Sequence, residues 1–278
     1  TRVAPRGQLV IWLMGHSQPL AEKVNSYGLH YIQVAYAREW FAKLNTEPLD
    51  DSQHLGNIRL EATTGRDASK AIDIPVPDSM QERAYQLVKA LAKANSAGRW
   101  EFFLTKDGKA LDWEKVIVSG ASHGATSAAR FGIAQKCARI VMFCGPRDQL
   151  DDWQALPSAT PSNRFFGYSH VLDSGWSGDH YPRSWLLMGL NKFGPIVNTD
   201  EAKHPYGNSR RLITKYDVKG DANKGHSFVQ VGKNPPKDAK GVPVQEDVWR
   251  YLYTSPVDEV GKPVPAESET RMNLRKKK

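Results

Sequence analysis

The sequence predicts an α/β fold in which a mostly parallel central sheet of about six strands is flanked by helices. Short runs rich in β-branched and aromatic residues alternate with stretches of helical periodicity, the pattern of a parallel sheet covered on both faces. The chain has 278 residues, 40% of them hydrophobic, which is enough for one large core. Six runs have strand character: residues 8–14, 29–36, 115–119, 139–144, 164–169 and 211–216.

Five segments carry the periodicity or the end signals of helices. The clearest is residues 79–95, where apolar residues recur at helical spacing and Ser79 and Glu82 form a capping box. A shorter helix over residues 19–27 ends at Gly28. We expect three more helices, at residues 123–135, 182–192 and 244–253.

We expect one domain over residues 1–255 with two long insertions, residues 37–78 and 170–210. Their length and their aromatic and charged content favour ordered excursions that shape a site, with surface decoration as the alternative. From residue 256 the Pro, Glu, Ser and Lys content is typical of a solvated tail, which predicts a basic C-terminal tail over residues 256–278.

The net charge of +8 is concentrated at the two ends of the chain. Seven of the 38 Lys and Arg residues lie in residues 1–6 and 271–278, where no acidic residue occurs. The rest of the chain is close to neutral, so we expect no nucleic-acid partner. The longest apolar run, residues 9–14, is far shorter than the roughly 20 residues of a membrane span, and we expect no integral membrane segment. A monomer is favoured.

Cys137 and Cys144 are too few for a disulfide framework or a CxxC metal cluster. We expect both to be buried free thiols, and we predict no metal site. The chain begins at Thr1 without a Met or an apolar leader, so a signal peptide was either removed or never present. The compartment stays open, with a secreted or periplasmic location favoured over a cytoplasmic one.

Residues 115–128 carry the clearest chemical signal. A predicted strand leads through Gly120-Ala121-Ser122-His123-Gly124, a G-x-S-x-G pattern, into a helix of small residues. The glycines let strand and helix approach closely, and the serine between them must adopt a strained backbone. The helix start adds backbone N–H groups and a positive dipole end where an oxyanion would develop. Ser122 is therefore the predicted nucleophile, and a glycine-rich turn without chemistry is the alternative.

This motif and the order of the elements resemble the α/β-hydrolase superfamily, above all its serine esterase and lipase-like members, over about residues 8–254. Only about seven residues precede the first strand, so the leading strand pair of larger members is absent or was cut away. The resemblance therefore implies a compact sheet, as in cutinase-like enzymes.

The same resemblance implies an acid and a histidine after later strands, in the order Ser, acid, His. Asp173 follows the strand at residues 164–169 and is the predicted acid. The alternative acid is Asp148, after the preceding strand, and Asp179 is a weaker third candidate. His226 is the predicted base because no other histidine follows the last strand.

The loop after the first strand stands where the superfamily holds a second oxyanion donor. Its sequence, Met14-Gly15-His16-Ser17-Gln18, departs from the usual HG or HGGG forms because the glycine precedes the histidine. The predicted oxyanion hole consists of the N–H of His123 together with that of His16 or Ser17.

These residues imply a serine carboxylesterase that works by acyl transfer through an acyl-enzyme, with no organic cofactor. Four further residues could line an aromatic cleft, although such side chains are more often core: Trp176, His180, Tyr168 and Trp153. The expected substrate is a small or aromatic ester, with feruloyl-type and polyester substrates included. A serine peptidase, an acyltransferase or a catalytically silent binding protein of this fold is the alternative.

Overall fold

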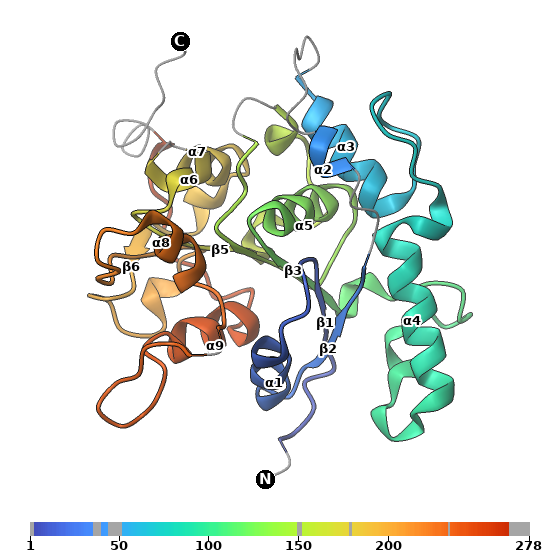
Figure 1. Cartoon of the computed structure of the whole chain (residues 1–278), viewed down its shortest axis with the longest axis horizontal. Coiled ribbons are helices and arrows are strands. Elements are labelled where there is room, and N and C mark those ends of the chain that lie inside the picture. Colours follow the sequence, from blue (N-terminus) through green and yellow to red (C-terminus); the bar gives the residue numbers. More distant parts are fainter. Residues whose placement is uncertain are drawn as a thin grey trace.

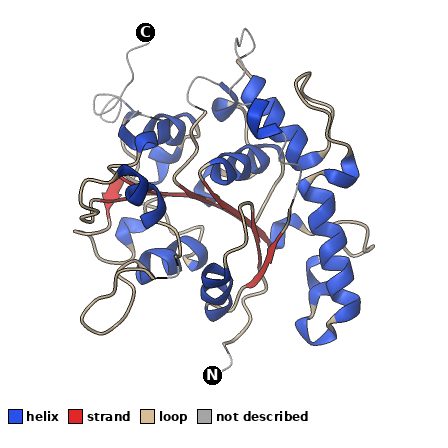
Figure 2. Ribbon diagram, in the orientation of Figure 1, coloured by secondary structure: helices blue, strands red, loops and turns tan. Residues whose placement is uncertain are grey.

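A sheet of seven parallel strands runs through the middle of the computed structural model (Figures 1 and 2). The structure describes residues 3–35, 40–43, 52–148, 152–177, 180–232 and 234–266. Within them the strand order is β2-β1-β3-β4-β5-β7-β6, and every pairing is parallel. The strands are β1 (Leu9–Trp12), β2 (His30–Gln33), β3 (Val116–Ala121), β4 (Arg139–Phe143), β5 (Phe165–His170), β6 (Ile196–Asn198) and β7 (Arg211–Thr214). The predicted fold class is confirmed.

Strand β6 is the one strand of this sheet that the sequence pattern did not predict. It lies inside the second insertion, pairs with β7 at the edge of the sheet, and all three of its residues are half-buried. Three residues give too few alternations for a strand to be recognised from periodicity. The expected number of strands was therefore one too low, while the six predicted ranges all overlap observed strands.

Helices cover both faces of the sheet (Figure 2). On one face lie α5 (His123–Ala134) and α7 (His180–Leu187), and α3 (His54–Thr64) packs against α5. On the other face lie α1 (Gln18–Ser26) and α9 (Glu246–Thr254). The remaining α-helices of the described residues are α2 (Trp40–Lys43), α4 (Met80–Ala94), α6 (Ser174–Ser177) and α8 (Ala222–Phe228). The five predicted helices correspond to α1, α4, α5, α7 and α9.

Both long insertions contain ordered elements within the described residues, and whether they shape a site stays a prediction. Helix α3 was not predicted because it is buried on nearly all sides, with Arg59 and Glu61 among its buried residues. A helix buried in this way lacks the alternation of apolar and polar faces from which helices are recognised. Glu61 accepts three backbone N–H groups, from Ala68, Ser69 and Ile74, and so organises the loop that follows the helix.

Cys137 and Cys144 are buried free thiols, as predicted. Among the described residues, no helix combines the length and the apolar character needed to cross a membrane.

The segment after α9 packs against the rest of the protein. Arg210 is fully buried, and its Nη2 donates to the carbonyls of Val257 (2.8 Å) and Glu259 (2.9 Å). Gly261 N–H donates to the Asn208 carbonyl at 3.0 Å. The predicted start of the solvated tail, residue 256, is therefore too early in the sequence. A buried guanidinium needs acceptors, and this segment provides them. The basic cluster at 271–278 lies outside the described residues.

Deleting residues 256–278 should lower the free energy of unfolding by about 2 kcal/mol or more, because Arg210 loses two hydrogen bonds. Deleting only 267–278 retains both bonds and should change stability by about 0.5 kcal/mol or less. Urea unfolding of the two shortened chains measures the difference. Equal stability of the two would contradict a structural role for the segment.

Candidate active site

Ser122 occupies the sharp turn between β3 and α5, at the carboxyl edge of the sheet. Its backbone has φ 54° and ψ −118°, a conformation that costs a residue with a side chain roughly 1–3 kcal/mol. Its N–H donates to the carbonyl of Phe143 at the end of β4 (2.9 Å), and its carbonyl accepts from Thr126 N–H (3.1 Å). In an elbow of this kind the hydroxyl is presented above the edge of the sheet.

The turn requires glycine on both sides of Ser122. A Cβ on Gly120 would lie 2.3 Å from the carbonyl carbon of Gly124. A Cβ on Gly124 would lie 2.8 Å from the carbonyl oxygen of Leu13 and from Met14 Sδ. Strand and helix thus approach too closely for side chains, and the loop after β1 lies directly against the start of α5. The spacing of the G-x-S-x-G pattern follows from this packing.

Asp173 and His226 form a hydrogen-bonded pair beyond the ends of two neighbouring strands. Asp173 follows β5, His226 follows β7, and these strands are paired in the sheet. His226 Nδ1 donates to Asp173 Oδ2 at 2.5 Å. Asp173 is fully buried, whereas the His226 side chain is 31% exposed. The imidazole therefore connects a buried carboxylate to solvent.

The hydrogen bonds around Asp173 keep its carboxyl group ionised. Burial by itself raises the pKa of Asp173, but the His226 hydrogen bond, the Gly175 N–H, the attraction of His226 and the Tyr181 hydroxyl together outweigh it. The net pKa of Asp173 is below its ordinary value. A charged acceptor is therefore present where the imidazole donates.

His226 lies in the short helix α8, not in the glycine-flanked loop that the sequence suggested. Asp221 caps this helix, because its Oδ1 accepts from the N–H groups of Asn223 (2.9 Å) and Lys224 (3.0 Å). The helix is only seven residues long, contains Gly225 and has little apolar periodicity. Its position after β7, the last strand among the described residues, is as expected.

The end of β4 links the elbow to the acid–base pair. Phe143 accepts from Ser122 N–H, and the next residue, Cys144, donates from Sγ to the His226 carbonyl at 3.0 Å. Cys144 Sγ, an Asp173 oxygen and a His226 ring nitrogen all lie within 4.8 Å of one another. Within the described residues no hydrogen bond joins the Ser122 hydroxyl to the His226 ring. In unliganded sites this bond is often long and tightens with substrate.

Cys144, Asp173 and His226 are also residue types that bind zinc. In this structure their donor atoms take part in hydrogen bonds, with Cys144 Sγ on the His226 carbonyl and His226 Nδ1 on Asp173. These donor atoms are therefore already engaged in hydrogen bonds within the protein.

Asp148, the alternative acid, has another partner. Arg59 of α3 donates to both of its carboxylate oxygens, from Nε at 2.5 Å and from Nη2 at 2.8 Å, and the pair is buried. Trp153 Nε1 also donates to Asp148 Oδ2 at 3.3 Å. Of the two acids, Asp173 is the one that contacts His226. Asp179 lies outside the described residues.

Arg59 is the residue near the elbow that the sequence analysis missed. Besides Asp148, it donates from Nη1 to the His123 carbonyl (3.3 Å) and to Ser127 Oγ (3.2 Å). It thereby ties the first insertion to the first turns of α5. Its acid partner is 89 positions away in the sequence, so no local pattern could have indicated the pair.

The predicted oxyanion donors border the elbow. Helix α5 begins at His123, so the His123 N–H lies at the N-terminus of the helix, beside Ser122. The loop that carries His16 and Ser17 follows Met14, which contacts Gly124. The Ser17 hydroxyl caps α1 by accepting from Leu20 N–H, and the His16 side chain is exposed. Oxyanion binding by this loop would thus use backbone N–H groups, and the choice between His16 and Ser17 stays a prediction.

The aromatic residues named for substrate binding are mostly packed in the interior. Trp153 and Tyr168 are fully buried, and Trp176 is nearly so and packs against Trp185 with ring centroids 5.9 Å apart. His180 is half-buried, with Nδ1 2.8 Å from the Arg147 carbonyl. Core packing accounts for Trp153 and Tyr168. Substrate contacts by Trp176 and His180, which follow the acid in the chain on α6 and α7, stay predictions.

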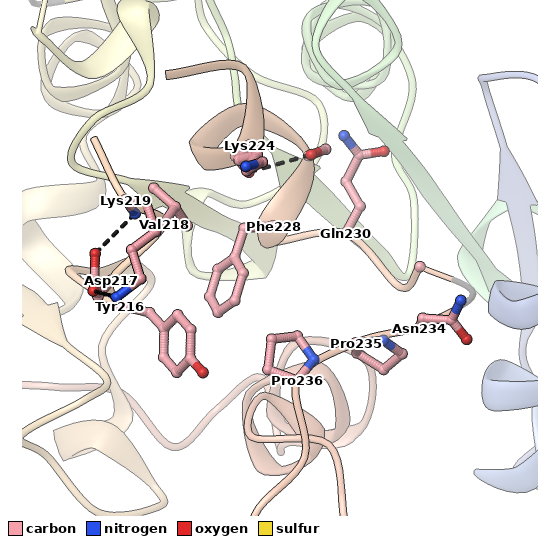
Figure 3. Close-up of a pocket in the computed structure, with 12 residues that line it drawn as sticks. Tyr216, Asp217, Val218, Lys219, Lys224, Phe228, Gln230, Asn234, Pro235 and Pro236 are labelled. Atoms are coloured by element: carbon pink, nitrogen blue, oxygen red, sulfur yellow. Dashed lines mark hydrogen bonds and ion pairs between the residues drawn. The ribbon is translucent and has the colours of Figure 1, made fainter. Parts of the chain in front are cut away.

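A cavity of about 430 Å³ lies beside α8 (Figure 3). Phe228 and Lys224 of this helix line it, together with Tyr216, which stacks on Phe228. Both helix residues are two positions from His226, which places them about 200° around the helix axis from it. The residues that line the cavity do not include Ser122, Asp173 or His226.

No family model matches the chain, and no curated protein matches it. Among solved structures, the chain is similar to a sugar hydrolase (YeeB) from Lactococcus lactis, with 12% sequence identity over 89% of this chain and 88% of that one. The TM-score of this match is 0.37, so the similarity carries no argument about activity.

Replacing Arg59 with Met should lower the free energy of unfolding by about 3–5 kcal/mol, because Asp148 stays buried without a charged partner. Combining this change with Asp148→Leu should recover part of the loss. Urea unfolding of the two single variants and the double variant measures the coupling. Strictly additive losses would contradict a coupled pair.

The protein should become less stable as the pH decreases, because His123 binds a proton more readily in the unfolded chain than in the folded one. Burial first, and then the charges of Arg59 and Arg147, lower the pKa of His123 to about 4. In the unfolded chain the pKa of His123 is near its ordinary value of 6.5, so the unfolded chain binds more protons between these two values. Stability should therefore decrease as the pH falls from about 6.5 to about 4.

The variant His123→Asn should lose less stability over that pH range, and His16→Asn, at an exposed position, serves as its control. Urea unfolding at pH 7 and pH 5 measures both. An unchanged slope in His123→Asn would assign the pH dependence to other groups.

Proposed function

We propose that this protein is a serine hydrolase that cleaves carboxylic esters, with Ser122 as nucleophile, His226 as general base and Asp173 as the acid that orients it. The observation that carries the proposal is the hydrogen bond between His226 and the buried Asp173, at the same sheet edge as the strained turn of Ser122. The three residues follow β3, β5 and β7, which lie within four consecutive strands of the sheet. This arrangement supports nucleophilic catalysis by serine, in which a base and the acid that orients it act beside the hydroxyl.

In the first step, Ser122 Oγ bonds to the ester carbonyl carbon while its proton passes to His226 Nε2. The carbonyl oxygen becomes an oxyanion, which in this proposal accepts from the N–H of His123 and from an N–H of the loop after β1. The tetrahedral intermediate then breaks its bond to the alcohol oxygen, which takes the proton from His226. The alcohol leaves, and the acyl group stays on Ser122.

In the second step, water attacks the acyl carbon while His226 takes one of its protons. Collapse of this intermediate returns the proton to Ser122 Oγ and releases a carboxylic acid. Throughout, Asp173 accepts from His226 Nδ1, which fixes the tautomer that leaves Nε2 free and stabilises the imidazolium.

For the substrate we propose a small or aromatic ester, including feruloyl-type esters and polyesters. Trp176 and His180 support an aromatic acyl or alcohol group, because they lie in α6 and α7, directly after the acid. Amide and alcohol-acceptor substrates in the same assays distinguish a peptidase or an acyltransferase from an esterase.

A fluorophosphonate probe should label the folded chain at Ser122, and Ser122→Ala should abolish the labelling. On p-nitrophenyl and hydroxycinnamoyl esters, His226→Ala should lower kcat about 10⁶-fold, because the base is lost, and Asp173→Asn should lower it about 10⁴-fold, because the orientation of the base is lost. Steady-state kinetics on purified, folded variants measures this.

The two candidate acids are separated by comparing Asp173→Asn with Asp148→Asn. The second variant should lose stability, since Arg59 is left without its carboxylate, while its folded fraction keeps kcat within about tenfold. If the folded chain is not labelled at Ser122, the proposed serine hydrolase function is ruled out, and a binding protein of this fold is the remaining alternative. Full activity of Asp173→Asn would rule out the assigned acid.

A further inference from the structure

The carboxylate of Asp173 has a second side-chain donor besides His226. While Oδ2 accepts from His226, Oδ1 accepts from the Tyr181 hydroxyl at 2.9 Å and from Gly175 N–H at 2.7 Å. On the basis of the function proposed above, we propose that Tyr181 is a positioning residue whose hydroxyl fixes the plane of the Asp173 carboxylate and thereby the His226 imidazole (α7 and α8 in Figure 1).

Two donors on one oxygen leave the carboxylate little freedom to rotate. A carboxylate bound only through Oδ2 could turn about its Cβ–Cγ bond and carry the imidazole with it. The donors to Oδ1 approach from two different elements, since Gly175 belongs to α6 and Tyr181 to α7. The orientation of Asp173 is thus determined by the second insertion as well as by β5.

Gly175 makes the approach of Tyr181 possible. A Cβ on Gly175 would lie 2.1 Å from Tyr181 Cζ and 2.3 Å from its hydroxyl oxygen. Only a residue without a side chain leaves room for the phenol ring at this place. Gly175 therefore contributes both an N–H donor and the space through which the tyrosine reaches the acid.

Helix α7 holds Tyr181 firmly in position. Tyr181 is fully buried, and Trp185, one turn further along the same face, is fully buried as well. Trp185 Nε1 donates to the Gly145 carbonyl at 2.9 Å, and its ring packs on Gly167 of β5, where a Cβ would lie 2.5 Å from Trp185 Cε2. The helix is therefore fixed against the segment after β4 and against β5 itself.

The groups around the carboxylate stay protonated donors over the working pH range. Burial, together with the nearby Cys144 and Asp173, raises the pKa of Tyr181 far above its ordinary value. Burial and Asp173 likewise raise the pKa of the Cys144 thiol well above its usual range. The negative charge of this cluster is thus confined to Asp173, where it can stabilise an imidazolium at His226.

The test is Tyr181→Phe in the full chain, assayed with p-nitrophenyl acetate. The loss of one hydrogen bond to a charged group should lower kcat about tenfold and leave KM within about twofold. The acidic limb of kcat/KM should move to higher pH, because a carboxylate with one donor fewer holds the proton on His226 more strongly.

The matched control is Tyr253→Phe, which also removes a fully buried hydroxyl, one that is hydrogen-bonded to Ser119 at 2.8 Å. It should keep the wild-type kcat and pH profile. Gly175→Ala keeps Tyr181 in the sequence, but the added methyl group would displace the Tyr181 hydroxyl from Asp173. This variant should reproduce the changes of Tyr181→Phe.

A second readout does not depend on hydrolysis. The proton between His226 Nδ1 and Asp173 gives a low-field NMR signal, which should move in Tyr181→Phe and stay in place in Tyr253→Phe. An unchanged signal, kcat and acidic limb in Tyr181→Phe would overturn the proposal, as would equal effects of both tyrosine variants. If the wild-type chain hydrolyses no ester, the proposed function fails, and the NMR comparison still decides the role of Tyr181.

Discussion

Strand β3 and helix α5 approach so closely that a Cβ on Gly120 would lie 2.3 Å from the backbone of Gly124. The chain between them has room for one tight turn, and Ser122 takes the strained φ of 54° that the turn demands. Because the turn occurs at the carboxyl edge of a parallel sheet, every later strand brings its own following residues to the same edge. The positions of Cys144, Asp173 and His226 all depend on this arrangement.

Two buried aspartates near this edge have different roles because their partners differ. Asp148 meets a guanidinium, whose fork geometry occupies both oxygens and leaves a neutral, structural pair. Asp173 meets an imidazole on one oxygen and neutral donors on the other, so its charge stays available to His226. Burial alone does not distinguish the two acids, and the chemistry of the neighbouring side chains does.

The positions of most strands and the elbow were predictable because they are local. Residues 115–128 contain a strand, a turn and a helix start in one continuous segment, and the position of His226 follows from chain order alone. What could not be predicted rests on contacts between distant segments. Arg59 meets Asp148 and Tyr181 meets Asp173 only after folding, and neither side chain has a local pattern that marks it.

The helix that contains His226 shows a second reason why sequence patterns failed to predict local structure. Helix α8 is held by the side chain of Asp221 rather than by an apolar face, so its sequence resembles a glycine-flanked loop. Similarly, Trp153 and Tyr168 were candidates for a cleft because aromatic residues favour both cores and binding sites. Their complete burial resolves this ambiguity in favour of packing.

The buried guanidinium of Arg210 has a consequence for how the chain acquires its structure during synthesis. Its acceptors at Val257 and Glu259 come 47 and 49 residues later in the sequence. While the ribosome still holds that segment in its exit tunnel, the acceptors already present are the carbonyls of Asn163 and Asn208, and Nη2 of Arg210 has only water to bind. A nascent chain that already contains Ser122, Asp173 and His226 therefore completes the hydrogen bonds of this guanidinium only when residues beyond 259 emerge.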